Sequence, residues 1–471
     1  MANNLKFESQ KLGINYFVVA AILFGAQLVM GLIAATQFLY PSFLFEIFDF
    51  SVARMVHINA LVVWMLYAMI GSVYYLLPDE TGIETVGIKL GKLGFYVLTA
   101  AVTVVVLVYI LVQVGPATES TIWLINEGRE YIEAPRWADI GIVVVVLVFV
   151  FNLFATAMKG KQTGIVTVLM ADVLALAGLY LAGMFWTDNI SMDQYWWWWV
   201  IHLWVEATWE VFVGCLAAYG LIKMIGARRE VVEMWLWIEV SMLFGSGILG
   251  MGHHYFWIGT PEYWWEIGAL FSALEPVPLV AMFVHVIYDW GKETGLKEGH
   301  GTGEKTMNNS PAFAWFVTNA FGNFLGAGVW GFFHTLPQVN IYTHGTQFTS
   351  AHGHLAFFGA YATILIGMFY MGVQGKNGIK VMKATFDSKM AIFLITFGVL
   401  GMTVSLTIAG YGQVLVERAQ MGATWEGFFV SQDMVWFVQG LGWRLAMGVM
   451  TFVGFVYLVK DLLTTAKSPR H

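Results

Sequence analysis

Two histidines in one apolar segment are the residues of this sequence that point most directly to chemistry. His352 and His354 lie in a run from His344 to Gln374 that contains no Lys, Arg, Asp or Glu, which is long enough to cross a bilayer as a helix. Each helical residue turns by about 100°, so the two side chains face opposite sides. An imidazole in hydrocarbon must be paired or liganded. Either each histidine holds a separate cofactor, or each is hydrogen-bonded to a neighbouring helix.

A second group of metal-ligating residues occurs earlier in the chain. His202, Glu206 and Glu210 are spaced at i, i+4 and i+8, so they line one face of a helix. His253 and His254 follow in the next apolar segment, and three imidazoles with one carboxylate could hold a metal. The oxygen ligand favours iron over copper, because harder ligands suit iron. The alternative for Glu206 is a carboxyl group that stays protonated in an apolar pocket.

Composition places both groups in a membrane. The 471 residues are 58% hydrophobic and 12% charged, about half the charge of a soluble domain. The single cysteine, Cys215, excludes disulfides within the chain, Cys-based iron–sulfur clusters and the attachment site of a c-type haem. Any redox cofactor must therefore be held mainly by His, Met or carboxylate.

The hydrophobic pattern predicts an all-α integral membrane protein with about twelve transmembrane helices. The expected spans are 14–39, 53–77, 92–115, 138–158, 163–186, 194–222, 231–258, 262–288, 311–335, 346–373, 389–412 and 429–459. We expect one transmembrane catalytic domain over residues 1–471.

Basic residues predict the orientation of the helices. With the N-terminus inside, the 24 Lys and Arg residues fall in inner segments except Arg54, Arg129, Arg136, Arg418 and Arg444. Basic residues concentrate on the cytoplasmic side, so both termini are expected in the cytoplasm.

The histidines of both groups are expected at one depth. At a rise of about 1.5 Å per residue, six histidines are expected roughly 6–12 Å below the outer surface. They are His57, His202, His253, His254, His352 and His354. Four helices that place histidine at one depth indicate a shared role. The other histidines are expected to be ordinary surface or interface residues: His285, His300, His334, His344 and His471.

Several motifs carry a resemblance to a known family. They are Arg54–His57, Glu127–Glu133, Trp199–Glu206, Gly252–Tyr255, Phe271–Glu275, Gly331–Thr335, Thr343–Gln347 and His352–His354. On these residues, the sequence resembles the large catalytic subunit of cytochrome-c-dependent nitric oxide reductase, a branch of the haem–copper oxidase superfamily. The resemblance covers nearly the whole chain and implies a bundle like subunit I of those oxidases.

The resemblance implies a set of cofactors and ligands. His57 and His354 would be the axial ligands of a low-spin haem b, and His352 would hold a high-spin haem b. A non-haem iron facing that haem would be bound by four residues: His202, Glu206, His253 and His254.

The resemblance also implies roles for other polar residues. Glu210 and Glu275 would line the pocket between the high-spin haem and the iron and handle protons. Arg54 could pair with a haem propionate. Glu130 would hold a calcium ion near the propionates, although an ordinary solvated loop glutamate is the alternative for that residue.

The implied activity is the reduction of two nitric oxide molecules to nitrous oxide and water, in denitrification or detoxification. Electrons would come from a separate, membrane-anchored cytochrome c subunit. Both subunits would lie in the cytoplasmic membrane of a bacterium, and no nucleic-acid partner is expected. The alternative is an oxygen reductase of the same superfamily. Most of those enzymes place a tyrosine at the position of Glu206, and this difference favours nitric oxide.

Overall fold

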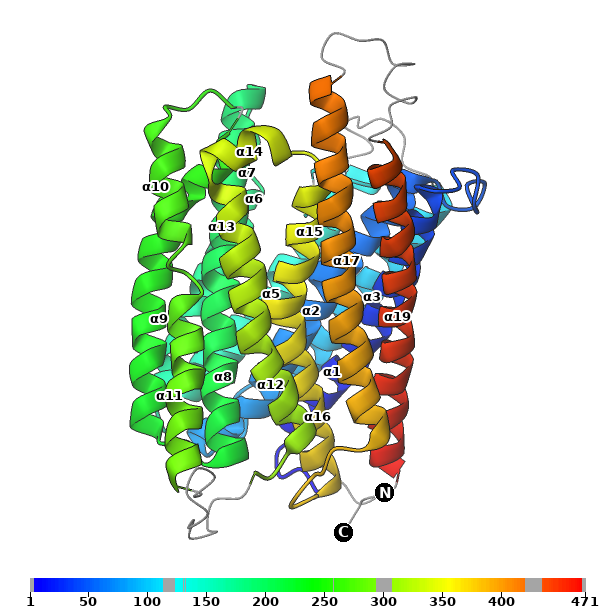
Figure 1. Cartoon of the computed structure of the whole chain (residues 1–471). Helices are drawn as coiled ribbons and strands as arrows, with labels where there is room; N and C mark the ends of the chain where they lie inside the picture. Colours follow the sequence, from blue (N-terminus) through cyan, green and yellow to red (C-terminus); the bar gives the residue numbers. More distant parts are fainter. Residues whose placement is uncertain are drawn as a thin grey trace. The chain divides into compact units, whose positions relative to one another are not determined.

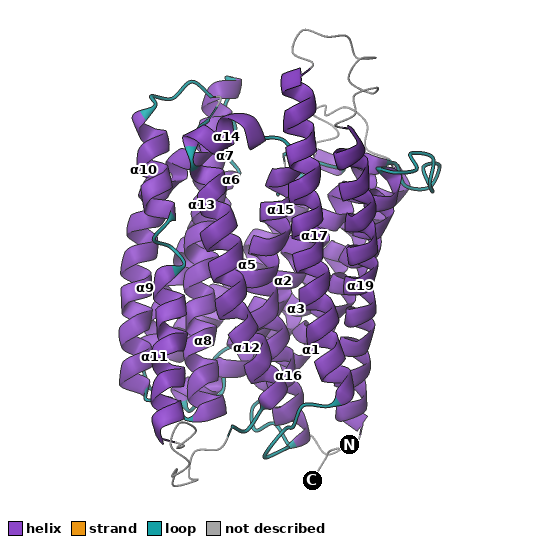
Figure 2. Cartoon of the chain, viewed as in Figure 1, coloured by secondary structure: helices purple, strands orange, loops and turns teal. Residues whose placement is uncertain are grey.

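The computed structural model describes residues 4–112, 123–129, 131, 133–256, 258–293, 307–419 and 434–467. Within these ranges the chain is helical and contains no β-strand (Figures 1 and 2). Its internal contacts divide the chain into two compact units. Unit 1 holds Met1–Gly183, Met368–Lys380 and Val459–His471, and unit 2 holds Met184–Gly367 and Val381–Leu458. The single catalytic domain expected from the sequence stays a prediction.

Unit 1 is built on aromatic packing between its first three helices. They are α1 (Glu8–Gln37), α2 (Phe50–Thr81) and α3 (Ile88–Val112). The Tyr16 ring on α1 lies 5.4 Å from the ring of Tyr67 and 4.8 Å from that of Phe95, measured between centroids. Helix α2 begins at Phe50 because the Asp49 side chain accepts a hydrogen bond from the backbone N–H of Val52, which is the usual role of an N-cap aspartate.

Two further helices complete the first part of unit 1, α5 (Arg136–Ala157) and α6 (Gly164–Gly183). Asn152 on α5 is 1% exposed and accepts a hydrogen bond from the Tyr74 hydroxyl of α2 at 2.8 Å. Its amide nitrogen donates to the Val86 carbonyl at 2.8 Å. A buried amide must find such partners, so Asn152 joins α5 to α2 and to the turn before α3.

Unit 2 contains most of the remaining helices, several of which change type along their length. In chain order they are α7 (Ile190–Leu203), η1 (Trp204–Trp209), α8 (Glu210–Ile225), α9 (Arg229–Gly250), η2 (Met251–His254), α10 (Tyr263–Ser272), α11 (Val277–Glu293), α12 (Ser310–Asn323), η3 (Phe324–Trp330), α13 (Gly331–Thr335), α14 (Pro337–Thr343), α15 (Gln347–Ala356), η4 (Phe357–Ala362) and α17 (Phe386–Ala419). Helices α16 (Thr363–Asn377) and α19 (Met434–Lys467) have residues in both units.

Eleven helices of the described residues are long and apolar enough to cross a membrane. They correspond to the spans expected from the sequence, apart from 311–335. That segment is continuous helix from Ser310 to Thr335 through α12, η3 and α13, but it is not among the eleven. The expectation of a helical protein with about twelve spans therefore agrees with the structure in kind and nearly in number.

Three π-helical turns interrupt the helices of unit 2, at η1, η3 and η4. A π turn leaves backbone carbonyls without their usual α-helical donors, and such turns occur often at functional sites. Here side chains supply donors. Asn319 Nδ2 on α12 lies 2.8 Å from Gly359 O and 2.7 Å from Ala360 O, both in η4. The Tyr361 hydroxyl of η4 donates to Val205 O in η1 at 3.0 Å.

The expected span 262–288 is not one straight helix. It consists of α10 and α11, separated by the turn residues Ala273–Pro276. Pro276 and Pro278 explain the break, because proline lacks the N–H that an α-helix requires. Glu275, expected inside a continuous helix, therefore lies in the turn.

We predict that Asn319→Leu destabilises unit 2 at η4. The substitution keeps a side chain of similar size but removes the donor to two buried carbonyls, and a buried polar group left unsatisfied costs about 1–3 kcal/mol. Thermal unfolding of the purified protein should show a lower midpoint. Thr318→Val is the matched control, because the Thr318 hydroxyl donates to Ala314 O within its own helix. An unchanged midpoint for Asn319→Leu would contradict this role.

Candidate metal centre

Three histidines and one glutamate converge in unit 2. Each of His202, Glu206, His253 and His254 offers one ligand atom, and these four atoms all lie within 4.8 Å of one another. Glu206 is at the middle of the group. Its Oε2 lies 3.3 Å from His202 Nδ1 and 3.6 Å from His253 Nε2, and its Oε1 lies 3.3 Å from His254 Nε2.

These separations match the ligand shell of a metal ion. Nitrogen and oxygen ligands bond to a tetrahedral ion at about 2.0–2.2 Å, which places them roughly 3.3–3.6 Å apart. The three measured separations fall in this interval. The side chain of His202 is also fully buried, and both of its ring nitrogens lack a hydrogen-bond partner among the described residues. A metal ion would satisfy one of these nitrogens.

Local helix geometry brings the four residues together. Helix α7 begins at Ile190, where the Asn189 side chain accepts from the backbone N–H of Met192 at 3.0 Å. His202 is in the last turn of α7, and Glu206 lies within the π turn η1. On the facing segment, α9 ends at Gly250 and tightens into the 3₁₀ turn η2, which carries His253 and His254.

Neighbouring side chains hold two of the imidazoles in place. His253 Nδ1 lies 2.7 Å from the Ser272 hydroxyl, which leaves Nε2 directed at Glu206. The His254 ring stacks on Trp198 with the ring centroids 4.7 Å apart and the planes within 4°. Metal-binding histidines usually have their second nitrogen fixed by a hydrogen bond, as His253 does.

Glu275 and Glu210 lie close to the same group. A methyl group placed on Gly250 would lie 2.9 Å from Glu275 Oε1 and 3.6 Å from His202 Nε2. A residue with a side chain at position 250 would therefore crowd Glu275 and His202. Glu275 and Glu210 are 6% and 3% exposed, and Glu206 is an electrostatic neighbour of each.

His352 and His354 occupy α15 as expected, two residues apart. Helix α15 begins at Gln347, with Thr346 as its N-cap. His352 Nδ1 lies 3.1 Å from Gly326 O in η3, and His354 Nδ1 lies 2.7 Å from Ser350 O. Each contact fixes the orientation of the ring through Nδ1.

His57 and Arg54 belong to α2 in unit 1. His57 Nδ1 lies 2.8 Å from Gln27 O of α1, and this contact fixes the orientation of its ring. A methyl group on Gly31 would lie 2.6 Å from His57 Nδ1, which explains why a glycine faces this ring. Arg54 is exposed. Glu130, expected to hold calcium, lies outside the described residues.

His334, expected from the sequence to be an ordinary surface or interface residue, lies near His352. Its ring centroid lies 5.9 Å from that of His352, and its Nε2 lies 3.2 Å from the Thr349 hydroxyl. The signal in the sequence was weak, because His334 and its neighbours are separated by the turn and short helix of residues 336–346. Only the folding back of α14 and α15 onto α13 brings them together.

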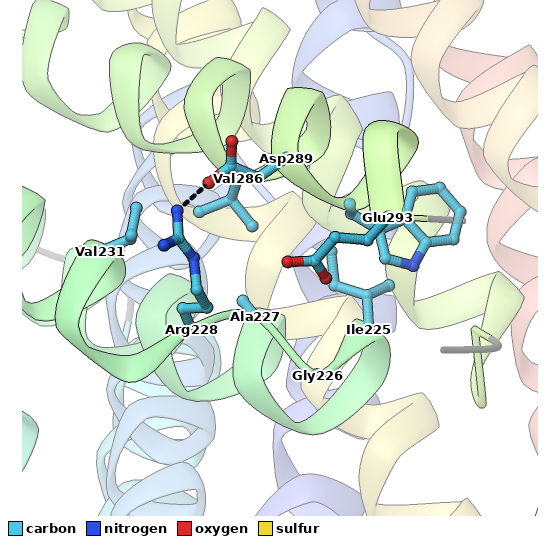
Figure 3. Close-up of a pocket in the computed structure, with 9 residues that line it drawn as sticks. Ile225, Gly226, Ala227, Arg228, Val231, Val286, Asp289 and Glu293 are labelled. Atoms are coloured by element: carbon cyan, nitrogen blue, oxygen red, sulfur yellow. Dashed lines mark hydrogen bonds and ion pairs between the residues drawn. The ribbon is translucent and has the colours of Figure 1, made fainter. Parts of the chain in front are cut away.

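A second cluster of charged residues lies at the other end of α9 and has no link to the metal centre. Arg228 forms an ion pair with Asp289 there, beside residues that include Val231 and Val286 (Figure 3). These residues line a cavity of about 10 Å³. This volume holds about one water molecule. Val231 is separated from His253 by roughly 30 Å of helix, so this pocket is distinct from the candidate centre.

Comparison with known proteins identifies the family. A family model described as Cytochrome C and Quinol oxidase polypeptide I matches residues 11–456. A solved heme-copper terminal oxidase dimer has a similar fold, with a TM-score of 0.65 at 12% sequence identity over 98% of this chain and 85% of that one. The chain therefore belongs to the cytochrome c and quinol oxidase polypeptide I family.

Two curated relatives show where the chain lies within this family. A nitric oxide reductase subunit of Stutzerimonas stutzeri is 39% identical over 458 residues, which is 96% of this chain and 94% of that protein. A cytochrome c oxidase subunit 1 homolog of Agrobacterium tumefaciens (strain T37) is 21% identical over 433 residues, 86% of this chain and 74% of that protein. The resemblance to nitric oxide reductase found in the sequence is thus confirmed.

We predict that Ser272→Ala weakens metal binding by His253 without unfolding the protein. The serine holds the imidazole through Nδ1, and loss of such a contact typically lowers metal affinity about 10–100-fold. Metal content after dialysis against a graded series of chelator concentrations would measure this change. Ser246→Ala is the control, because the buried Ser246 hydroxyl donates to Met242 O within α9. Equal metal retention by both variants would show that Ser272 does not support the site.

Proposed function

We propose that this chain catalyses the reduction of nitric oxide. Two nitric oxide molecules, two electrons and two protons give one nitrous oxide and one water. The reaction would take place between a high-spin haem b held by His352 and a non-haem iron held by His202, Glu206, His253 and His254. The relative that is 39% identical bears the name of this activity.

The position of Glu206 is the observation that carries the proposal. Both of its carboxylate oxygens face imidazole nitrogens at 3.3–3.6 Å, so it fits as a metal ligand. An oxygen ligand beside three nitrogens favours iron over copper. The same position would hold a tyrosine in most oxygen reductases of the superfamily, and a carboxylate cannot replace the hydrogen atom that such a phenol would supply.

The histidines assigned to haem have a suitable chemical environment. His57, His352 and His354 each place Nδ1 within 3.1 Å of a backbone carbonyl. A histidine whose Nδ1–H is bonded to a carbonyl presents Nε2 as the metal ligand. His352 also has Glu206 and His254 among its electrostatic neighbours. This arrangement supports a haem on His352 that faces the non-haem iron. The resemblance to nitric oxide reductase implies a second haem b with His354 and His57 as its axial ligands.

The chain's own residues would prepare and feed the reaction. When bound, the two irons would supply the positions for nitric oxide and the electrons. Glu206 would offset the positive charge of the metal in a low-dielectric site. Glu210 and Glu275 are buried beside the centre and are the acids placed to deliver two protons. Trp198, which stacks on His254, would present an apolar surface to a small neutral gas.

Electron supply requires a partner. The single cysteine prevents this chain from binding a c-type haem covalently, so we infer that a membrane-anchored cytochrome c subunit delivers electrons from the outer side. The distribution of basic residues supports both termini in the cytoplasm of a bacterium. In this orientation Arg54 lies near the outer surface, where it would pair with a haem propionate. Calcium at Glu130 is part of the same proposal.

Turnover assays with nitric oxide and with oxygen test the function directly. The purified enzyme, given reduced cytochrome c, should consume nitric oxide and form nitrous oxide faster than it consumes oxygen. Glu206→Ala should lower the nitric oxide rate well over tenfold, because even changes beyond the ligand shell cost about 10–100-fold. Exposed Glu266→Ala on α10 is the control. Faster oxygen consumption would favour an oxygen reductase, and a colourless protein would favour a proton-coupled transporter.

Metal content provides an independent prediction. Two b haems and one non-haem iron require three irons per chain and no copper. Pyridine haemochrome measurement gives the haem content, and elemental analysis gives total iron and copper. One copper per chain in place of the third iron would contradict the assignment of Glu206 as an iron ligand.

The two histidines of α15 should affect different haems. His354→Ala should remove the low-spin haem signal and stop electron entry, because it deletes an axial ligand. His352→Ala should disturb the high-spin haem and leave the bis-histidine signal. Optical and electron paramagnetic resonance spectra distinguish these outcomes. If both substitutions changed the same haem alone, the placement of cofactors on opposite faces of α15 would be wrong.

A further inference from the structure

A buried pair of acids in unit 1 has no part in the proposed reaction. Glu127 precedes α5 and is 1% exposed, and Asp139 in the first turn of α5 is fully buried. Arg136, three residues before Asp139, forms an ion pair with Glu127. Each acid is therefore held within the protein near the guanidinium group of Arg136.

The hydrogen bonds around Asp139 are incomplete if both acids are ionised. The Tyr180 hydroxyl of α6 donates to Asp139 Oδ1 at 2.8 Å. Oδ2 is buried, and no donor among the described residues reaches it. Arg136 binds Glu127 and lies one helical turn before Asp139 on α5, so the Glu127 carboxyl is brought beside that of Asp139, where the two groups are electrostatic neighbours. A buried carboxylate oxygen without a donor carries a cost of about 1–3 kcal/mol or more.

Two carboxyl groups can hydrogen-bond to each other only if one of them carries a proton. Two carboxylates at hydrogen-bond distance repel strongly in a low-dielectric site, and such pairs share one proton. A proton on Asp139 Oδ2 would donate to Glu127 and would satisfy the oxygen that otherwise has no donor. Glu127 would then be the single anion paired with Arg136, and the group would be neutral overall.

We propose that Glu127 and Asp139 form a proton-binding site in which two buried carboxyl groups hold one proton between them. The shared proton fastens the segment that contains Glu127 to the first turn of α5. Arg136 balances the remaining charge, and Tyr180 fixes the orientation of the Asp139 carboxyl. The site lies in unit 1 and requires neither haem nor iron, so it stands whether or not the proposed reaction is correct.

Helix α3 contributes a further buried polar group near the pair of Glu127 and Asp139. Tyr109 on α3 is 1% exposed, and its hydroxyl has no hydrogen-bond partner among the described residues. Its electrostatic neighbours are Glu133, Asp139 and Glu127. Glu133 itself accepts a hydrogen bond from Asn59 Nδ2, so it is occupied elsewhere. Among the described residues, the titratable groups around the pair include Arg136 on α5, Tyr180 on α6, Tyr109 on α3 and Glu133. Buried Arg129, two residues after Glu127, donates to the Gly183 carbonyl.

Infrared spectroscopy tests the shared proton. The complete enzyme, with its cofactors and partner, is prepared in a detergent without ester groups, and the C=O stretch of protonated carboxyl groups is recorded. Glu127→Gln and Asp139→Asn should each remove the signal of one protonated carboxyl per chain, because the remaining acid ionises beside Arg136. The double variant should remove the same single signal. Asp172→Asn, at a separate buried acid on α6, is the control. The change that it makes in the carboxyl C=O signal should add to the change made by Asp139→Asn when both substitutions are combined.

Two results would overturn the proposal. No loss in either single variant would mean that both acids are ionised. Loss of two signals in the double variant would mean that each acid carries its own proton. If Asp139→Asn does not accumulate, Tyr180→Phe gives the same test, because removal of the donor to Oδ1 should shift the frequency of the shared carboxyl without abolishing it. An unshifted spectrum of Tyr180→Phe would contradict the pair.

Discussion

The rest of unit 2 depends on one constraint, which is the cost of placing the Glu206 carboxylate among helices that are otherwise apolar. An ionised carboxylate in hydrocarbon needs a cation or a metal. Three imidazoles surround Glu206 at 3.3–3.6 Å, and neutral imidazoles alone do not compensate a full negative charge. A metal ion that bonds to all four groups would compensate it. The positions of α7, η2 and the turn at Glu275 are therefore understood best as the support of a charged centre.

Irregular helix geometry meets this constraint. The proposed metal ligands lie at the end of α7, in the π turn η1 and in the 3₁₀ turn η2, whereas regular helix carries the apolar contacts farther away. Each irregular turn exposes backbone groups, and polar side chains from neighbouring helices bind them. Asn319 and Tyr361 perform this task for η4 and η1. Local irregularity at the centre thus depends on specific partners outside it.

The sequence predicted the parts of this structure that follow from the cost of polarity in a membrane. Histidines and acids in apolar segments must be satisfied, so His202, Glu206, His253 and His254 could be grouped from their types and depth alone. Irregular geometry could not be predicted in this way. The π turns are set by hydrogen bonds between helices distant in sequence, as from Asn319 to Gly359. The contact of His334 with His352 was missed for the same reason, and the helix break at Glu275 could have been anticipated from Pro276 and Pro278.

The π turn at η1 also has a consequence for how such chains diverge. A π turn closes its hydrogen bond one residue later than an α turn, so η1 accommodates one residue more than regular helix would. Removing that residue would let η1 close as regular α-helix, so the helices on either side would keep their faces while residues within the turn, such as Glu206, would change theirs. A relative without the turn would therefore show a one-residue gap between His202 and Glu210 in an alignment. Within this helix, a change in length rather than a change of residue type would mark the loss of the present arrangement.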